Sequence, residues 1–412
     1  RPIARNPKYG EAGASPVRGI STGLSLCQLQ QLARAVAHKR WVPAKTLRKF
    51  CGLGVSTTLS VTTARYHLRS LYSTLGGTQT GHVRQHHQDL RDLGWWANLT
   101  GHPGLGRALW PGPPAHVIHT DASEYGWGAV LYGALSARGF HVPRLRRAHI
   151  NLLELATVRL ALNSFRRFVT RRDTWVLLKS DSTVTVGAMN ALASRSSPLM
   201  RELRELHALC SSWGVSIRAE HLPSAVNAYA DRLSRERDST DWTLPLAATR
   251  TLEERHGPHT VDVFASHLNT RCGRFYSATW TPGCAGFNAL GSRSWAVKNC
   301  WANPPFHLLT AVVDKAIRDG AHMTLIAPRW EAQPLFWRAV EACTTCFQLP
   351  PRADVFTHGS RSTPAANPTW DVMVFRLVGV LHPSLSAGSV WSLAGRGSTS
   401  DGTSAPNALG PC

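Results

Sequence analysis

The chain has 412 residues and a formal charge of +21 at pH 7, from 46 Lys and Arg against 25 Asp and Glu. This length allows two or three domains with cores of their own, and the positive charge favours polyanionic partners. No apolar run approaches the roughly 20 residues that span a bilayer, and no secretory signal pattern is found, which argues against a membrane partner. The nine cysteines are scattered and odd in number, so we expect no disulfide framework and a reducing compartment, the cytoplasm or the nucleus.

The first expected domain, residues 1–110, is basic and helical. It holds 15 Lys and Arg but only three acidic residues, which predicts salt-dependent binding of phosphates. Apolar residues recur at helical spacing over 24–75, and Pro43, Gly52 and Gly54 are expected to break this stretch into two or three short helices. The alternative is a plain helical domain with a merely basic surface.

Residues 116–235 alternate between strand and helix patterns, which predicts an α/β domain. Three strands come first, followed by alternating helices and strands. Asp121 and Asp181 each follow an apolar strand, where open α/β sheets place their ligands, and Glu154 on the first turns of a helix can point at them. The expected strands are 117–120, 126–132, 139–142, 175–179 and 215–219, and the expected helices are 151–168, 198–213 and 225–233.

An acidic quartet stands out in this basic chain: Asp121, Glu154, Asp181 and Asp231. Four carboxylates brought together without a cation repel one another, and some would take up protons at neutral pH. A divalent metal ion removes that cost, so the pattern predicts a metal site. The alternative is four scattered surface carboxylates.

The segments around these acids resemble the ribonuclease H of reverse-transcribing elements. His221 also fits that family's terminal motif, because it lies ten residues before Asp231. The matching segments are Thr120-Asp121-Ala122-Ser123, Gly126-Trp127-Gly128-Ala129, Asn151-Leu152-Leu153-Glu154-Leu155, Ser180-Asp181-Ser182, His221-Leu222-Pro223-Ser224 and Asn227-Ala228-Tyr229-Ala230-Asp231-Arg232-Leu233-Ser234-Arg235.

The resemblance implies a ribonuclease H-like mixed sheet with flanking helices and a two-metal hydrolysis of the RNA strand of RNA–DNA hybrids. It implies that Asp121, Glu154, Asp181 and Asp231 bind two Mg²⁺ ions, with Mn²⁺ as a substitute. It also implies that His221 shuttles protons or assists product release; a loop histidine without chemistry is the alternative. The 2′-hydroxyls of the RNA strand would distinguish the hybrid from DNA.

Four arginines close to the first long helix are candidates for binding the phosphates of the hybrid, although a solvated helix end fits equally well. They are Arg166, Arg167, Arg171 and Arg172.

The run Val42–Tyr72, followed by Leu93-Gly94-Trp95-Trp96, resembles the polymerase thumb and connection that precede ribonuclease H in retrotransposons. No Tyr-x-Asp-Asp segment occurs, so we expect no polymerase activity. We expect a piece of a longer retroelement polyprotein of DIRS-like or Ty3-like type.

After an expected linker at 236–258, residues 259–380 show a third αβ pattern, which predicts a Rossmann-like domain. A Ser-, Gly- and Pro-rich tail at 381–412 is expected to be disordered. Cys343-Thr-Thr-Cys346 has metal-like spacing but lacks a second pair. The expected strands are 261–266, 300–302, 323–327 and 370–377, and the expected helices are 308–318 and 335–343.

Asn303-Pro304-Pro305-Phe306 resembles the signature of methyltransferases that act on exocyclic amines, and its surroundings resemble the adenine-N6 methyltransferase-like domain of bacteriophages and DIRS-type retrotransposons. The asparagine oxygen and a proline carbonyl would accept both amine hydrogens, while Phe306 stacks on a flipped base. Asp262 would lie near S-adenosylmethionine. The following turn, Ala265-Ser266-His267, departs from the family's Gly-rich turn.

The sequence therefore predicts a ribonuclease H that acts during reverse transcription. Two alternatives stay open: adenine-N6 methylation of DNA as the main activity, or a catalytically idle nucleic-acid-binding remnant. An integrase or transposase is disfavoured, because such enzymes usually use three acids and the Asn227–Arg235 ending does not fit them.

Overall fold

The computed structural model describes residues 18–19, 23–58, 61, 63–99, 107–108, 112–133, 135–145, 147–170, 174–236, 242–291, 294–296, 298–349, 357–358 and 370–379. Within these ranges, no helix combines the length and the apolar character needed to cross a bilayer. The expected tail at 381–412 and the candidate residues Arg171 and Arg172 lie outside them.

The N-terminal part is helical, as expected, and adds two short two-stranded ribbons, β1 with β4 and β2 with β3. Its helices enclose an apolar core in which the rings of Phe50 and Trp96 meet edge to face at 5.8 Å. The elements are α1 (Gly23–Val36), β2 (Trp41–Pro43), α2 (Ala44–Ser56), η1 (Tyr66–Leu68), α3 (Arg69–Leu75), β3 (His82–Arg84) and α4 (His87–Ala97), with β1 (Arg18–Gly19) paired to β4 (Arg107–Ala108).

The expected helix break at Gly52 and Gly54 is wrong, because α2 continues through both. A glycine inside a helix costs only about 1 kcal/mol relative to alanine, and packing can offset that cost. At Gly54 a Cβ atom would lie 2.6 Å from a methyl group of Leu68. The glycine therefore lets η1 lie directly against α2.

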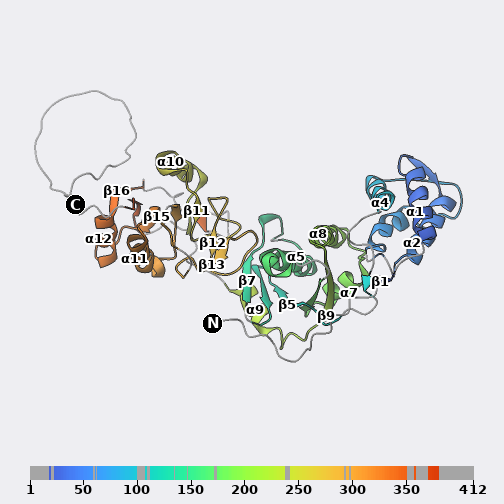
Figure 1. Ribbon diagram of the computed structural model, residues 1–412, viewed down its shortest axis with the longest axis horizontal. Coiled ribbons are helices and arrows are strands. Elements are labelled where there is room, and N and C mark those ends of the chain that lie inside the picture. The colour runs from blue at the N-terminus through green and yellow to red at the C-terminus, as the bar shows by residue number, and fades with distance from the viewer. Residues whose placement is uncertain are drawn as a thin grey trace, which may run out of the picture. The chain divides into compact units, whose positions relative to one another are not determined.

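Residues 116–235 form the ribonuclease H-like mixed sheet that the sequence predicts (Figure 1). The strand order is β7-β6-β5-β8-β9, with β6 and β7 antiparallel and β5, β8 and β9 parallel. The third strand comes earlier than expected, at 135–140 instead of 139–142. The strands are β5 (His116–Ala122), β6 (Gly126–Leu131), β7 (Leu135–Phe140), β8 (Thr174–Ser180) and β9 (Val215–His221).

The helices expected at 151–168, 198–213 and 225–233 are present with shifted bounds, the first divided into two at Phe165 and the last starting at Ala228, whereas α7 (Thr183–Ala191) was not predicted. Ser182 begins α7 by accepting a hydrogen bond from the backbone N–H of Thr185, and Leu192 ends it in the left-handed conformation. The helices are α5 (Ile150–Ser164), α6 (Arg166–Val169), α7 (Thr183–Ala191), α8 (Ser197–Trp213) and α9 (Ala228–Arg235), with the short turn η2 at Pro143–Leu145.

Helix α9 lies directly on the backbone of β6, and two glycines make this possible. A Cβ atom at Gly128 would come within 2.4 Å of the Ala230 carbonyl oxygen, and one at Gly126 would come within 3.2 Å of the Ser234 carbonyl oxygen. Residues two apart on a strand face the same side, so both glycines lie under the helix. This close contact fixes the position of the terminal motif.

The C-terminal part is a Rossmann-like αβ domain, as the sequence predicts. Its sheet has the order β11-β14-β15-β18-β16, in which the first three strands are parallel and β18 is antiparallel to both of its neighbours. The elements are β11 (Val261–Asp262), β12 (Tyr276–Ser277), β13 (Gly286–Phe287), β14 (Asn299–Ala302), η3 (Phe306–Leu308), α11 (Leu309–Asp319), β15 (His322–Pro328), α12 (Pro334–Ala342), β16 (Cys343–Gln348) and β18 (Val372–Leu377).

The segment expected as a linker, 236–258, differs from that expectation. It contains β10 (Trp242–Thr243), which pairs with β17 (Thr357–His358), and helix α10 (Leu246–His256). Leu244 and Leu252 are buried in a cluster with Trp301 and Phe347. The described part of the segment therefore belongs to the C-terminal domain, since these apolar side chains complete its core.

The C-terminal domain also covers the outer edge of strand β7. Trp280 forms a bridge to Ala137, in which the N–H of Arg138 donates to the Trp280 oxygen at 3.2 Å and the Trp280 N–H donates to the Ser136 oxygen at 3.3 Å. Gly139 permits this approach, because a Cβ atom there would lie 2.9 Å from the ring of His267.

Candidate functional site

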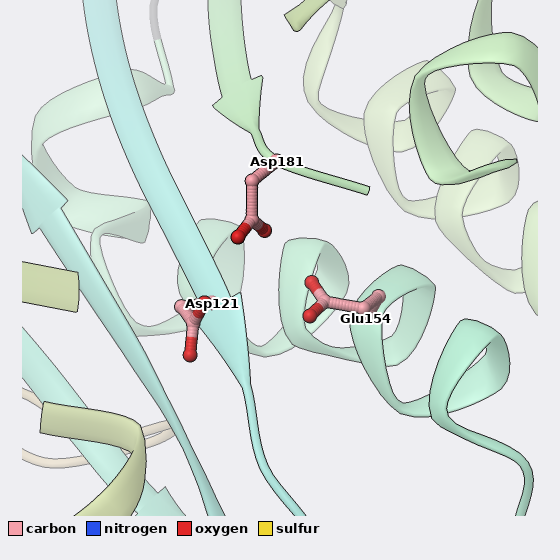
Figure 2. A group of neighbouring side chains, drawn as sticks. All are labelled: Asp121, Glu154 and Asp181. Atoms are coloured by element: carbon pink, nitrogen blue, oxygen red, sulfur yellow. The ribbon is translucent and has the colours of Figure 1, made fainter. Parts of the chain in front are cut away.

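Three of the four predicted acids converge. Asp121, Glu154 and Asp181 each offer a carboxylate oxygen, and these oxygens all lie within 4.8 Å of one another. Figure 2 shows the three side chains reaching the same space from a strand, a helix and the end of a second strand. The sequence positions are far apart, so the fold itself builds the cluster.

The local structure explains why these side chains meet. Strands β5 and β8 are parallel neighbours, with Ile118 opposite Leu178, so Asp121 and Asp181 come to the same end of the sheet. Glu154 lies on the first turns of α5, whose N-terminal residue His149 accepts a hydrogen bond from the N–H of Asn151 at 3.2 Å. A capped helix start holds the glutamate beside the strand ends.

Two serines fix two of these carboxylates, and the sequence analysis assigned a role to neither. The Ser234 hydroxyl donates to Asp121 at 2.6 Å, and the Ser224 hydroxyl donates to Asp181 at 2.6 Å. Both serines stand in the terminal motif segments. Hydrogen bonds from hydroxyls to carboxylates favour the ionised form, which is the form that binds metal.

The chemistry of the cluster fits a divalent cation. Asp121 is 3% exposed and Glu154 is 6% exposed, so their negative charges are largely removed from water. Ionised carboxylates at such short range repel one another unless a cation lies between them. Three carboxylates make an all-oxygen donor set, which is the kind that Mg²⁺ and Mn²⁺ accept.

Asp231 is not among the three acids that converge in the structure, so its place in the metal-binding quartet stays a prediction. Its carboxylate instead accepts a hydrogen bond from the guanidinium of Arg235, four residues further along α9, at 2.6 Å. The packing of α9 on β6 directs Ser234 to Asp121, while the Asp231 side chain is 39% exposed.

His221, Arg166 and Arg167 lie on the surface. His221 is the last residue of β9, and its side chain is exposed. Its backbone pairs with that of Ser180, the residue before Asp181, so His221 lies next to the strand end that leads into the acidic cluster. Arg166 and Arg167 are exposed on α6, and the Arg166 guanidinium lies 5.5 Å from the ring centre of Trp213. The arginine is therefore held by an aromatic ring within its own domain.

A second candidate site lies at the carboxyl ends of β11 and β14. Asn303 directly follows β14, and the turn that begins at Val263 directly follows β11. Both line a cavity of about 300 Å³. Other residues that line it are Phe264, Ser266, Asn269 and Pro305 from this domain, with Arg138 and Phe140 from β7. Carboxyl ends of parallel strands are the usual ligand position in open α/β folds.

Asp262 and Phe306, which were predicted to act at this site, both make contacts within the domain. The Asp262 carboxylate is buried and accepts backbone N–H groups of Phe264 at 3.2 Å and Arg271 at 3.0 Å, so it closes the turn after β11. The ring of Phe306 packs edge to face against Trp330 at 5.2 Å and Trp370 at 5.4 Å. The Phe306 ring, which was predicted to stack on a flipped base, thus packs against other aromatic rings of its own domain.

The Cys343 and Cys346 thiols lie beside each other because of an irregularity in β16. The pairing with β18 shifts register between Cys343 and Thr345, and both cysteines pack against the same apolar core. A hydrogen bond from Cys343 lowers the pKa of Cys346 to about 7, and the same bond, with burial, raises the pKa of Cys343.

Comparisons with known proteins match only parts of the chain. A family model described as DNA N-6-adenine-methyltransferase (Dam) matches residues 232–327. No curated protein sequence matches the chain.

Solved structures similar to the chain include ribonucleases H. LC11-RNase H1 in complex with an RNA/DNA hybrid is 18% identical, with a TM-score of 0.26, and the match covers 29% of this chain and 92% of that one. The N-terminal RNase H domain of a Mycobacterium tuberculosis protein is 24% identical, with a TM-score of 0.24 and coverages of 29% and 88%. The foamy viral protease-reverse transcriptase in complex with RNA/DNA hybrid is 14% identical, with a TM-score of 0.20 and coverages of 52% and 28%.

Proposed function

We propose that the ribonuclease H-like domain hydrolyses the RNA strand of RNA–DNA hybrids. The observation that carries this proposal is the convergence of Asp121, Glu154 and Asp181, from three separate segments, on one space within 4.8 Å. Burying ionised carboxylates close together raises the free energy of the folded chain, and a bound divalent cation offsets that cost. A purely structural role would not need such a cluster.

In the proposed reaction, Asp121, Glu154 and Asp181 hold Mg²⁺. When bound, the cation supplies the positive charge that lowers the pKa of water and stabilises the leaving oxygen. Ser234 and Ser224 orient Asp121 and Asp181 through their 2.6 Å hydrogen bonds. A water oxygen forms a bond to phosphorus while the bond from phosphorus to the 3′ oxygen breaks.

Two further residues complete the proposal. His221, exposed at the end of β9, takes up or delivers protons at the edge of the site, which an imidazole can do near neutral pH. Asp231 joins the ligand set only when its carboxylate leaves Arg235. We further propose that the chain is a piece of a retroelement polyprotein that acts inside the cell during reverse transcription.

The test compares cleavage of a labelled RNA–DNA hybrid by the wild-type chain, Asp181→Asn and Asp314→Asn in the presence of Mg²⁺. Asp314 is a matched control, because it is an aspartate ion-paired with Arg338 outside the cluster. We expect Asp181→Asn to reduce the cleavage rate by about 100- to 1,000-fold, the loss typical for one electrostatic group of an active site. We expect Asp314→Asn to cleave as the wild type does.

A binding readout makes this test independent of activity. Mg²⁺ or Mn²⁺ at 100 times its Kd should stabilise the wild-type chain by about 2.7 kcal/mol, and Asp181→Asn should lose most of that gain. If Asp181→Asn cleaves and is stabilised as well as the wild type, the proposed metal site is wrong.

A second candidate function is methyl transfer to an amino group of adenine in DNA. Two observations favour it: the Dam family match over 232–327 and the cavity beside Asn303 and Pro305. The residues around the cavity fit S-adenosylmethionine only in part, because the Asp262 carboxylate is already satisfied by two backbone N–H groups. The test is methyl transfer to adenine-containing DNA by the wild type and by Asn303→Ala, and equal transfer by both would refute a role for Asn303.

A further inference from the structure

The exposed surface of the N-terminal helical part carries positive charge without exposed acids. Between residues 23 and 99 the chain has ten Lys and Arg and two acidic residues, Asp89 and Asp92. Both acids are buried, at 0% and 2% exposure. In the described part of 23–99, the charged side chains at the surface are therefore all basic.

Each of these two acids makes its hydrogen bonds inside the fold. Asp89 accepts hydrogen bonds from the Thr74 hydroxyl at 2.6 Å and from the His86 N–H at 2.8 Å. Asp92 accepts from the Ser70 hydroxyl at 2.6 Å, lies 3.0 Å from the His67 ring nitrogen, and pairs with Arg204 at 3.6 Å. Neither acid is therefore placed to neutralise the exposed cations.

A two-stranded ribbon displays an aromatic ring among these cations. Strands β2 and β3 are antiparallel, with Trp41 opposite Arg84 and Pro43 opposite His82. The central residues Val42 and Val83 are buried in the core, so the alternating flanking residues face outward. Two tryptophans of the described residues are exposed, and Trp41 is the more exposed of them, at 56% against 42% for Trp337.

The ribbon is held in place by the residues beside it. The Gln85 N–H donates to the Arg40 oxygen, and the Ala44 N–H donates to the Gly81 oxygen, both at 2.9 Å. The Trp–Arg pair thus stands on a fixed support. Lys39, Arg40 and Lys45 flank it, and all three are exposed.

We propose that the exposed face of the β2–β3 ribbon binds single-stranded nucleic acid, with Trp41 stacking on an unpaired base and Arg84 contacting the adjoining phosphate. An exposed aromatic ring among cations is the arrangement that binds single strands, and the cationic surroundings favour a polyanion with flat rings over an apolar protein surface. Stacking on a ring is tolerant of base identity, so we expect little sequence preference. The proposal goes beyond the nuclease activity and does not depend on it.

The experiment measures binding of a labelled 20-nucleotide single strand, as oligo(dT) and as oligo(U), to the full chain in EDTA, where metal-dependent cleavage cannot occur. The variants are Trp41→Ala, Trp41→Phe, Arg84→Ala and Trp337→Ala. Trp337 is the matched control, because it is 42% exposed but lies in the C-terminal domain, where its ring nitrogen donates to the Glu331 backbone oxygen.

We expect Trp41→Ala to weaken binding by about 5- to 150-fold, the range for one stacked base, and Trp41→Phe to restore part of the loss. Arg84→Ala should reduce the slope of log affinity against log salt by about 0.7, the value for one contact to a single strand. Trp337→Ala should bind as the wild type does.

Two outcomes would overturn the proposal. One is binding by Trp41→Ala within twofold of the wild type. The other is a change of oligomeric state in Trp41→Ala with unchanged affinity, which would make the ribbon a contact between copies of the chain. Because the measurement uses no cleavage, failure of the nuclease proposal leaves it interpretable, and the inactive Asp181→Asn variant should bind normally.

Discussion

Replacing Gly128 by alanine tests the contact between α9 and β6 that positions Ser234. The new Cβ would lie 2.4 Å from the Ala230 oxygen, 2.6 Å from the Leu233 Cβ and 2.8 Å from the Ser234 nitrogen. Ordinary contact begins at 3.4 Å, so the helix must retreat by about 1 Å. A 2.6 Å hydrogen bond from Ser234 to Asp121 that lengthens by about 1 Å is no longer a hydrogen bond.

Overpacking of this kind costs about 1–3 kcal/mol. The chain has several domains, so the cost is best measured locally, by hydrogen exchange of the backbone amides in 126–131 and 228–235. We expect these amides to exchange about 5- to 150-fold faster in Gly128→Ala than in the wild type. Loss of the Ser234 hydrogen bond should also weaken Mg²⁺ binding.

Gly187→Ala is the matched control. Gly187 lies inside helix α7 and has nothing within 4 Å of an added Cβ, so alanine should stabilise the helix by about 0.8–1 kcal/mol and slow its exchange. If Gly128→Ala leaves protection in β6 and α9 unchanged, the direct packing of α9 on β6, and with it our account of Ser234, is refuted.

Two further predictions concern titratable groups. Burial first, and then a neighbouring histidine, lowers the pKa of His207 and of His267 to about 4, so between pH 6.5 and 4 the unfolded chain binds more protons than the folded one. The free energy of unfolding should therefore be highest above pH 6.5 and fall towards pH 4. In urea titrations, His267→Gln should show a shallower fall with pH than the wild type. An unchanged pH profile would contradict the lowered pKa of His267. Because Cys343 lowers the pKa of Cys346 to about 7, iodoacetamide should modify Cys346 at pH 7.5 faster than Cys210, whose pKa burial raises to about 12, and Cys343→Ala should slow the reaction at Cys346, as mass spectrometry would report.

The sequence predicted those features that depend on local pattern. Apolar runs placed the strands that carry Asp121 and Asp181, and helical spacing placed α5 with Glu154. It did not predict α7, whose residues 183–191 include two threonines, two valines and a glycine, all poor helix formers. Tertiary contacts and the Ser182 cap outweigh those propensities.

The candidate site shows the same division. Motif order identified the three converging acids, but no local pattern tells that α9 lies on Gly126 and Gly128. That packing decides that Ser234, and not Asp231, reaches Asp121. In the same way, the residues of α10 were predicted as a linker because their apolar partners, Trp301 and Phe347, are distant in sequence.

The bridge between Trp280 and β7 has a consequence for how the chain can be divided. Strand β7 is an edge of its sheet, and Trp280 uses the backbone groups of Ser136 and Arg138 on that edge. A shortened protein that ends after Arg235 would leave those groups open to pairing with strands of other molecules, a common route to aggregation. An expression boundary drawn at the end of the terminal motif would thus expose this edge, whereas one that retains the C-terminal domain through residue 379 keeps the edge closed.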